Sequence, residues 1–210
     1  MVEPVETGAR WSSASRPRAD NGRVNADSTL SRALSPRLIL TRPEQADLPE
    51  LFDLHSDVRV WEHLPSARHV DAAQTQQLVD GYRAGWESNG LDVWVARDRE
   101  TGALVGMGGP SLRGGRAWNL YYRLAPSVWG RGYAQEIVTA ARAATAQLGS
   151  ELPHVAFLLE HNEGSRRAAE RAGLELVWRG PDHGNPDPAA IRLVYADRPL
   201  DAEELAVFVN

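Results

Sequence analysis

Two glycines, Gly130 and Gly132, lie between a segment with the composition of a strand and a segment with the spacing of a helix. Residues 119–124 are rich in bulky side chains, which favours a strand. From Ile137 onward, apolar residues recur at intervals of three and four. The first amides of a helix have no internal acceptor, and the helix dipole adds about half a positive charge there. Glycines leave such amides accessible and permit positive φ. The turn therefore predicts a phosphate or diphosphate site, and the alternative is a plain strand-to-helix turn.

Two common phosphate motifs do not fit this turn. A Walker loop requires Gly-Lys-Ser/Thr after its spacer, whereas Gly132 is followed by Tyr133. A dinucleotide fingerprint requires a third small residue, and Gln135 stands at that position. These two mismatches exclude a nucleotide-binding α/β domain.

The turn resembles the acyl-coenzyme A loop of the GNAT acetyltransferases, whose pattern is Gln/Arg-x-x-Gly-x-Gly/Ala. The first position departs from that pattern, because this chain has tryptophan there. Trp-Gly-x-Gly-Tyr-Ala nevertheless resembles the RimJ/RimL-like branch of the family. A second block, Asn-Glu-Gly-Ser at 162–165 with Arg-Ala-Gly-Leu at 171–174, resembles the Asn-x-x-Ser…Gly-Phe of that branch. The loop residues are Trp129, Gly130, Arg131, Gly132, Tyr133 and Ala134.

This resemblance, over about residues 38–198, implies a fold, a coenzyme and its contacts. The expected fold is α+β: a central mixed, mostly antiparallel twisted sheet, flanked by helices and splayed at the acyl-CoA loop. The implied cosubstrate is acetyl-CoA, with no metal, and its diphosphate would rest on the amides of residues 130–134. The pantetheine arm would pair with the strand edge at Tyr122, Arg123 and Leu124. Asn162 would bond that arm from the other side, and a helix N-cap is its alternative or additional role.

The implied reaction is attack by an amine on acetyl-CoA, with departure of a thiolate. Many members place a tyrosine seven residues after the asparagine, where this chain has Ala169. Ser165, three residues after Asn162, is therefore expected to donate to the sulfur as hydrogen-bond donor or acid, and an ordinary first-turn serine is the alternative. Asn119 replaces the glutamate that often serves as base, so it could only position a water.

The acceptor side is expected in the segment between the first two helices. Glu62 or His63 would serve as base or ammonium anchor, or each would be a solvated loop residue; His161 and His183 are further candidates for the base. The acceptor would be the α-amine of a protein N-terminus or a small amine, including an antibiotic. A non-catalytic acyl-CoA-binding sensor or interaction module is the alternative function, favoured by Asn119. The expected substrate-binding residues are Trp61, Glu62, His63, Trp86 and Tyr121.

Periodicity and turn residues predict the elements that position these side chains. Helices are expected at 44–57, at 71–88, after the glycine turn and after Asn162. Mixing hairpins with crossovers predicts an α+β layer fold. We expect a flexible tail at 1–35, a GNAT domain at 36–200 and a C-terminal helical extension at 201–210, which would pack on the body or contribute to a homodimer contact. Strands are expected at 38–41, 93–96, 103–107, 119–124, 155–159, 176–178 and 190–195.

Composition limits the class of protein. The 210 residues are 42% hydrophobic and 24% charged, which is ordinary for a soluble globular chain. The net charge of −5 argues against a nucleic-acid partner. There is no cysteine, so disulfides and thiolate metal sites are excluded. No apolar run reaches the roughly 18 residues of a membrane helix, and no apolar signal core begins the chain, so the cytoplasm is the expected location.

Overall fold

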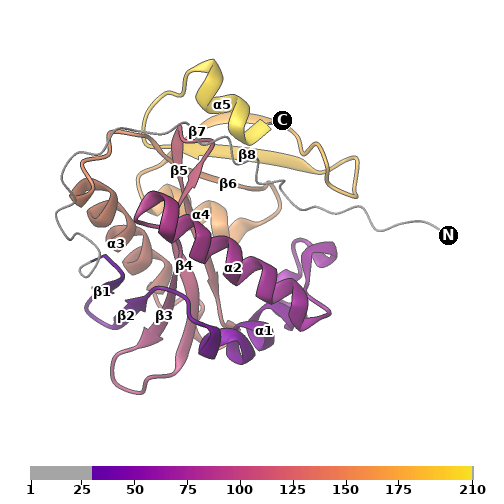
Figure 1. Ribbon diagram of the computed structural model, residues 1–210. Helices are drawn as coiled ribbons and strands as arrows, with labels where there is room; N and C mark the ends of the chain where they lie inside the picture. Colours follow the sequence, from indigo (N-terminus) through magenta and orange to yellow (C-terminus); the bar gives the residue numbers. More distant parts are fainter. Residues whose placement is uncertain (1–29, 210) are drawn as a thin grey trace.

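A computed structural model describes residues 30–209 (Figure 1). Eight strands form one sheet in this part of the chain, in the order β1-β2-β3-β4-β5-β6-β8-β7. Neighbouring strands are antiparallel except β5 and β6, which are parallel. The expected mixed, mostly antiparallel α+β sheet is therefore confirmed. The strands are β1 (Arg32–Leu34), β2 (Leu38–Thr41), β3 (Trp94–Asp98), β4 (Leu104–Arg113), β5 (Ala117–Leu124), β6 (His154–Leu159), β7 (Glu175–Pro181) and β8 (Ile191–Ala196).

Five α-helices in the described residues cover both faces of the sheet. Their positions follow from the alternation of side chains along a strand. On β5, the even-numbered Trp118 and Leu120 pack in one cluster with Ile137 of α3. Met107, which pairs with the odd-numbered Arg123, packs in a second cluster with residues of α1 and α2. The helices are α1 (Leu48–Ser56), α2 (Ala72–Asn89), α3 (Tyr133–Gln147), α4 (Glu163–Arg171) and α5 (Ala202–Val209).

Helix α5 lies on the same face as α1 and α2. Phe208 is 2% exposed and packs in a third cluster with Ala117 of β5 and Val155 of β6. Ala117 shares its face of β5 with the other odd-numbered residues, and α3 and α4 lie on the opposite face. The expected C-terminal extension is thus a helix that completes the core, and in Figure 1 it lies beside β7 and β8.

The expected boundary of the tail at residue 35 is wrong, because ordered structure begins earlier. Leu30 is 4% exposed, and its carbonyl accepts a hydrogen bond from the indole of Trp94 at 3.0 Å. Strand β1 then pairs with β2. The remainder of the expected tail, residues 1–29, lies outside the described residues. Within the described range, no helix is long and apolar enough to cross a membrane.

Candidate active site and coenzyme site

A gap between β5 and β6 lies at the centre of the sheet. The two strands pair only at Trp118–His154 and Asn119–Val155, so residues 120–124 have no neighbour on that side. Peptide groups of an antiparallel strand point alternately to one neighbour and to the other. Since the N–H of Ala125 donates to Val105 on the β4 side at 2.9 Å, the N–H and C=O of the odd-numbered residues of β5 point to β4.

This alternation corrects one expected coenzyme contact. The peptide groups of Tyr122 and Leu124 point into the gap, as a pairing edge requires. The peptide group of Arg123 points to β4 instead, where Met107 is its partner. Arg123 therefore offers the gap no main-chain group, and its side chain lies on the face covered by α1 and α2.

Trp129 ties the loop to the end of β5. Its indole N–H donates to the carbonyl of Leu124 at 2.9 Å, although the side chain is 49% exposed. This bond occupies the carbonyl of Leu124. The N–H of Leu124 and the N–H and C=O of Tyr122 remain available in the gap. The tryptophan that departs from the family pattern thus fixes where the strand ends and the loop begins.

The loop at residues 130–134 presents a row of unpaired amides. Gly130 and Gly132 have φ values of 75° and 82°, which a residue with a Cβ rarely adopts. Gln135 and Glu136 both donate to the carbonyl of Gly132. Within the described residues, four earlier N–H groups donate to no acceptor, and a run of unpaired amides opening a helix suits an anion such as a diphosphate. They belong to Gly130, Gly132, Tyr133 and Ala134.

Arg37, which is distant from this loop in the sequence, contacts it in the fold. Its Nη2 donates to the carbonyl of Arg131 at 2.9 Å, and its guanidinium lies 4.2 Å from the ring centroid of Tyr133. Arg37 also pairs with Glu136, a carboxylate in the first turn of α3. Without that pairing the carboxylate would repel an anion at the helix N-terminus. The sequence analysis missed Arg37; an acid in the first turn of a predicted phosphate-binding helix was the signal for a cation nearby.

The first turn of α4 brings three predicted residues together. Asn162 accepts a hydrogen bond from the N–H of Ser165 at 3.1 Å, so it is the N-cap of this helix. Its Nδ2 group makes no hydrogen bond in the part of the chain that the structure describes, and is available to a ligand. The phenol of Tyr122 donates to the carbonyl of Ser165 at 3.3 Å, which joins β5 to α4 at the gap. Ala169 is 3% exposed in the core, so it has no chemical role.

On the opposite face, the segment between α1 and α2 covers β5. The guanidinium of Arg123 stacks 3.8 Å from the centroid of Trp61. Its Nη1 lies 3.3 Å from the carbonyl of Val60 and 3.3 Å from Nε2 of His63. His161, which precedes α4, lies with Nε2 2.9 Å from the carbonyl of His63. The α1–α2 segment is thus bonded to both sides of the gap.

Three histidines beside Arg123 have lowered pKa values. Burial, the charge of Arg123 and His161 lower the pKa of His63 to about 4. Burial lowers the pKa of His55 to about 3, and burial with Arg123 lowers that of His69. Neutral imidazoles can accept a proton or a hydrogen bond, so Arg123 lies among uncharged imidazole rings.

The other predicted residues are placed less favourably for chemistry. Asn119 is 4% exposed, on the face of β5 that also carries Tyr121. Glu62 is exposed and makes no hydrogen bond or ion pair with any described residue. His183 lies exposed between β7 and β8. The expected substrate contact of Trp86 is wrong: it is 5% exposed, packs on Trp94 and donates to the Val93 carbonyl at 3.0 Å.

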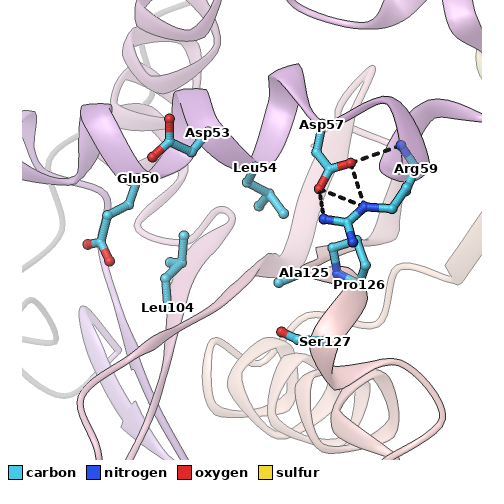
Figure 2. Close-up of a pocket in the computed structure, with 9 residues that line it drawn as sticks. All are labelled: Glu50, Asp53, Leu54, Asp57, Arg59, Leu104, Ala125, Pro126 and Ser127. Carbon is cyan, nitrogen blue, oxygen red and sulfur yellow. Dashed lines mark hydrogen bonds and ion pairs between the residues drawn. The ribbon is translucent and has the colours of Figure 1, made fainter.

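A surface hollow lies outside this gap (Figure 2). It separates α1 from the ends of β4 and β5, and Asp57 and Arg59 form an ion pair at its rim. None of the sequence-predicted site residues lines it. We therefore assign the chemistry to the gap. The hollow is lined by Glu50, Asp53, Leu54, Asp57, Arg59, Leu104, Ala125, Pro126 and Ser127.

A mixed sheet that splays beside a glycine loop of free amides defines the GNAT class of acyltransferases. The chain matches the family model for the acetyltransferase (GNAT) domain over residues 37–175. It therefore belongs to this family and is a GNAT-type N-acetyltransferase, and the family's acyl donor is acetyl-CoA.

Individual relatives agree with this assignment. YkkB, an uncharacterized protein of Bacillus subtilis, is 28% identical over 151 residues, which cover 69% of this chain and 85% of YkkB. An acetyltransferase from Agrobacterium tumefaciens is 26% identical, with a TM-score of 0.64 over 83% of this chain and 98% of its own. RimL, a ribosomal L7/L12 α-N-protein acetyltransferase solved with coenzyme A, is 19% identical, with a TM-score of 0.65 over 81% and 98%. The fold of RimL, from the branch that the loop motif resembles, is thus the fold of this chain.

Proposed function

We propose that this chain transfers the acetyl group of acetyl-CoA to a primary amine by direct attack of the amine on the thioester carbonyl. The row of unpaired amides at residues 130–134, beside the gap in the sheet, carries this proposal. Four N–H groups without an acceptor, at and just before a helix N-terminus, suit the paired phosphates of the coenzyme. The free peptide edge at Tyr122 and Leu124 suits the amide-bearing pantetheine arm.

The same elements supply the other contacts that the coenzyme requires. The Nδ2 of Asn162 would donate to the pantetheine arm while Oδ1 caps α4. A main-chain N–H that faces the gap would donate to the developing oxyanion, and one such donor typically contributes about 2.7–4 kcal/mol. The hydroxyl of Ser165 would donate to the sulfur as the carbon–sulfur bond breaks, so that the thiolate leaves protonated or hydrogen-bonded.

The amine must lose one proton, and Asn119 cannot accept it because an amide is not a base. We propose that the acceptor of this proton lies in the α1–α2 segment, at Glu62 or His63. His63 is neutral over the usual working range because its pKa is lowered to about 4. If His63 is the base, kcat/KM falls on the acid side near that pKa, and the His63→Gln variant loses this limb. A profile that is identical in His63→Gln would assign the base to another group.

The acceptor is a protein N-terminal α-amine or a small amine. The RimL neighbour, described as acting on the α-amine of ribosomal L7/L12, supports the first. The two classes separate in one experiment, in which acetyl-CoA is supplied with a panel of short peptides with free N-termini and a panel of small amines. Thiol release is recorded, and the acetylated product is identified by mass.

A non-catalytic acyl-CoA sensor is the second candidate, favoured by the buried amide of Asn119 at the usual place of a base. The sensor binds acetyl-CoA by calorimetry and releases no thiol with any amine, whereas the enzyme releases thiol with at least one panel. Absence of coenzyme binding to the intact chain would overturn both candidates.

A further inference from the structure

Arg123 is a half-buried cation without an anionic partner. None of the ion pairs among the described residues includes it. Its neighbours are uncharged: Nη1 contacts the carbonyl of Val60 and the imidazole of His63. Partial burial of a guanidinium without a counter-charge lowers the stability of the folded state. A functional role, such as binding an anion, would explain why the chain has an arginine here.

The contacts of the side chain leave one terminal amino group of the guanidinium, Nη2, without a hydrogen bond among the described residues. The face of Arg123 lies on Trp61, and its Nε is 3.5 Å from the hydroxyl of Tyr121. The Nη2 group makes no hydrogen bond within residues 30–209. An arginine held flat by an aromatic ring, with a free terminal N–H group, can donate a charge-assisted hydrogen bond to a carboxylate.

The charge of Arg123 lowers the pKa values of the neighbouring histidines. After burial, it is the next cause that lowers the pKa of His63 and of His69, and it contributes at His55. The imidazoles are therefore uncharged and do not compete for an anion. No described carboxylate compensates this local positive charge within ion-pair distance.

The side chain of Arg123 lies on the face of the sheet opposite the proposed coenzyme site, where the amine would enter. The loop amides open α3, so in the proposed reaction the coenzyme would approach from the face covered by α3 and α4. The amine would then reach the thioester from the other face, where the guanidinium of Arg123 stacks on Trp61. Arg123 directly follows Tyr122, whose peptide groups face the gap.

We propose that the acceptor amine carries a carboxylate and that Arg123 binds it, with Trp61 and His63 orienting the guanidinium. This inference rests on the proposed acetyl transfer and specifies its substrate class. The carboxylate would come from a free amino acid or from an acidic side chain near the N-terminus of a peptide. Both sources present the same planar anion near a primary amine.

The test compares acceptors with and without the carboxylate, with kcat/KM expressed per unprotonated amine. One arm pairs free amino acids with their carboxamides, and the other pairs N-terminal peptides that contain aspartate with the same peptides containing asparagine. The wild type is expected to prefer the carboxylate by about tenfold or more in kcat/KM. Arg123→Gln is expected to lose about tenfold or more for the carboxylates and less than about twofold for the amides, and Arg123→Lys to retain part of the preference.

A control variant and a binding measurement make the result specific. Arg68→Gln alters an exposed arginine of the same α1–α2 segment, bonded only to the Ser56 carbonyl, and should change neither acceptor series. Calorimetry with the CoA-bound protein should show that the carboxylated amines bind more tightly than their amides, and that Arg123→Gln removes the difference. A thermal melt confirms that each variant is folded.

The outcomes separate this inference from the proposed function. Equal kcat/KM values for acids and amides in the wild type, or an equal loss for both in Arg123→Gln, would overturn the carboxylate inference. Arg123 would then serve only to hold the α1–α2 segment against β5. Charge-dependent binding without acetyl transfer would support it and overturn the proposed function. The arm that shows the preference identifies the amino acid or the peptide as the source of the carboxylate.

Discussion

The phenol of Tyr122 lies 3.3 Å from the carbonyl oxygen of Ser165 and joins the free edge of β5 to the first turn of α4. Burial raises the pKa of Tyr122, and hydrogen bonding to Ser165 offsets this only in part. The phenol therefore keeps its proton at neutral pH. The phenol of Tyr122 and the main chain of Ser165 thus meet where the proposed mechanism places the leaving sulfur.

We expect Ser165→Ala to lower kcat about 100-fold, because a proton donor to the departing thiolate acts mainly in the transition state. Tyr122→Phe should cost less, about tenfold, since it removes a group that supports Ser165. Steady-state kinetics with a fixed amine give both values. Ser127→Ala, an exposed serine before the loop, should behave as the wild type. A loss below threefold in Ser165→Ala would leave the serine without a chemical role.

The free amides of the loop depend on Gly132, whose φ of 82° places it in the left-handed region. Gly132→Ala should raise the KM for acetyl-CoA about tenfold with little change in kcat, because strain of about 1–2 kcal/mol distorts binding rather than chemistry. Gly149→Ala is the matched control: its φ is 68°, no atom lies near its Cβ position, and it follows the far end of α3. This control should lose stability and keep its KM. A parallel rise in KM in both variants would show that strain anywhere in α3 has the same effect.

Local patterns predicted much of this fold and site. The glycine turn, the helix from Tyr133 and the N-cap at Asn162 could be predicted because turn and cap chemistry depends on adjacent residues. The splay of the sheet could be predicted only through the family resemblance. The peptide direction of Arg123 depends on the register with β4, which no local pattern reveals.

Contacts between distant segments could not be predicted from the sequence. Arg37 and Glu136 are 99 residues apart, and only the tertiary fold brings them together. Trp86 was expected to bind the substrate, yet its side chain packs on Trp94 and donates to the Val93 carbonyl in the core. Arg123 was expected to pair with the pantetheine arm, and its contacts with Trp61 and His63 come from a segment that is distant in the sequence.

The pairing of Arg37 with Glu136 should support coenzyme binding. Arg37→Gln leaves a carboxylate unpaired in the first turn of α3, so the KM for acetyl-CoA should rise about three- to tenfold, and less at high salt. The double variant Arg37→Gln/Glu136→Gln removes both charges and should recover most of the affinity. Kinetics at two ionic strengths test both. Failure of the second substitution to restore binding would mean that the bond from Arg37 to the Arg131 carbonyl matters more than its charge.

A buried carboxylate outside the gap should control how stability depends on pH. Asp92 is 1% exposed and accepts a hydrogen bond from the N–H of Val93 at 2.8 Å. Helix α2 can pack on it only because residue 85 is glycine: a Cβ there would lie 1.8 Å from Oδ2. Burial raises the pKa of Asp92 from 3.8 to about 6, although the bond from Val93, the nearby hydroxyl of Ser111 and the charge of Arg113 oppose this.

Because the pKa of Asp92 is higher in the folded chain, the folded state holds more protons between about pH 4 and pH 6. The contribution of Asp92 to the free energy of unfolding must then fall as pH rises through this window, by about 3 kcal/mol in total. Asp92→Asn abolishes that fall, so the variant should gain stability relative to the wild type above about pH 6 and match it near pH 4. Urea denaturation across this range measures the difference, with the exposed Asp53→Asn as control. Equal pH slopes in wild type and Asp92→Asn would show that Arg113 keeps the buried carboxylate ionised.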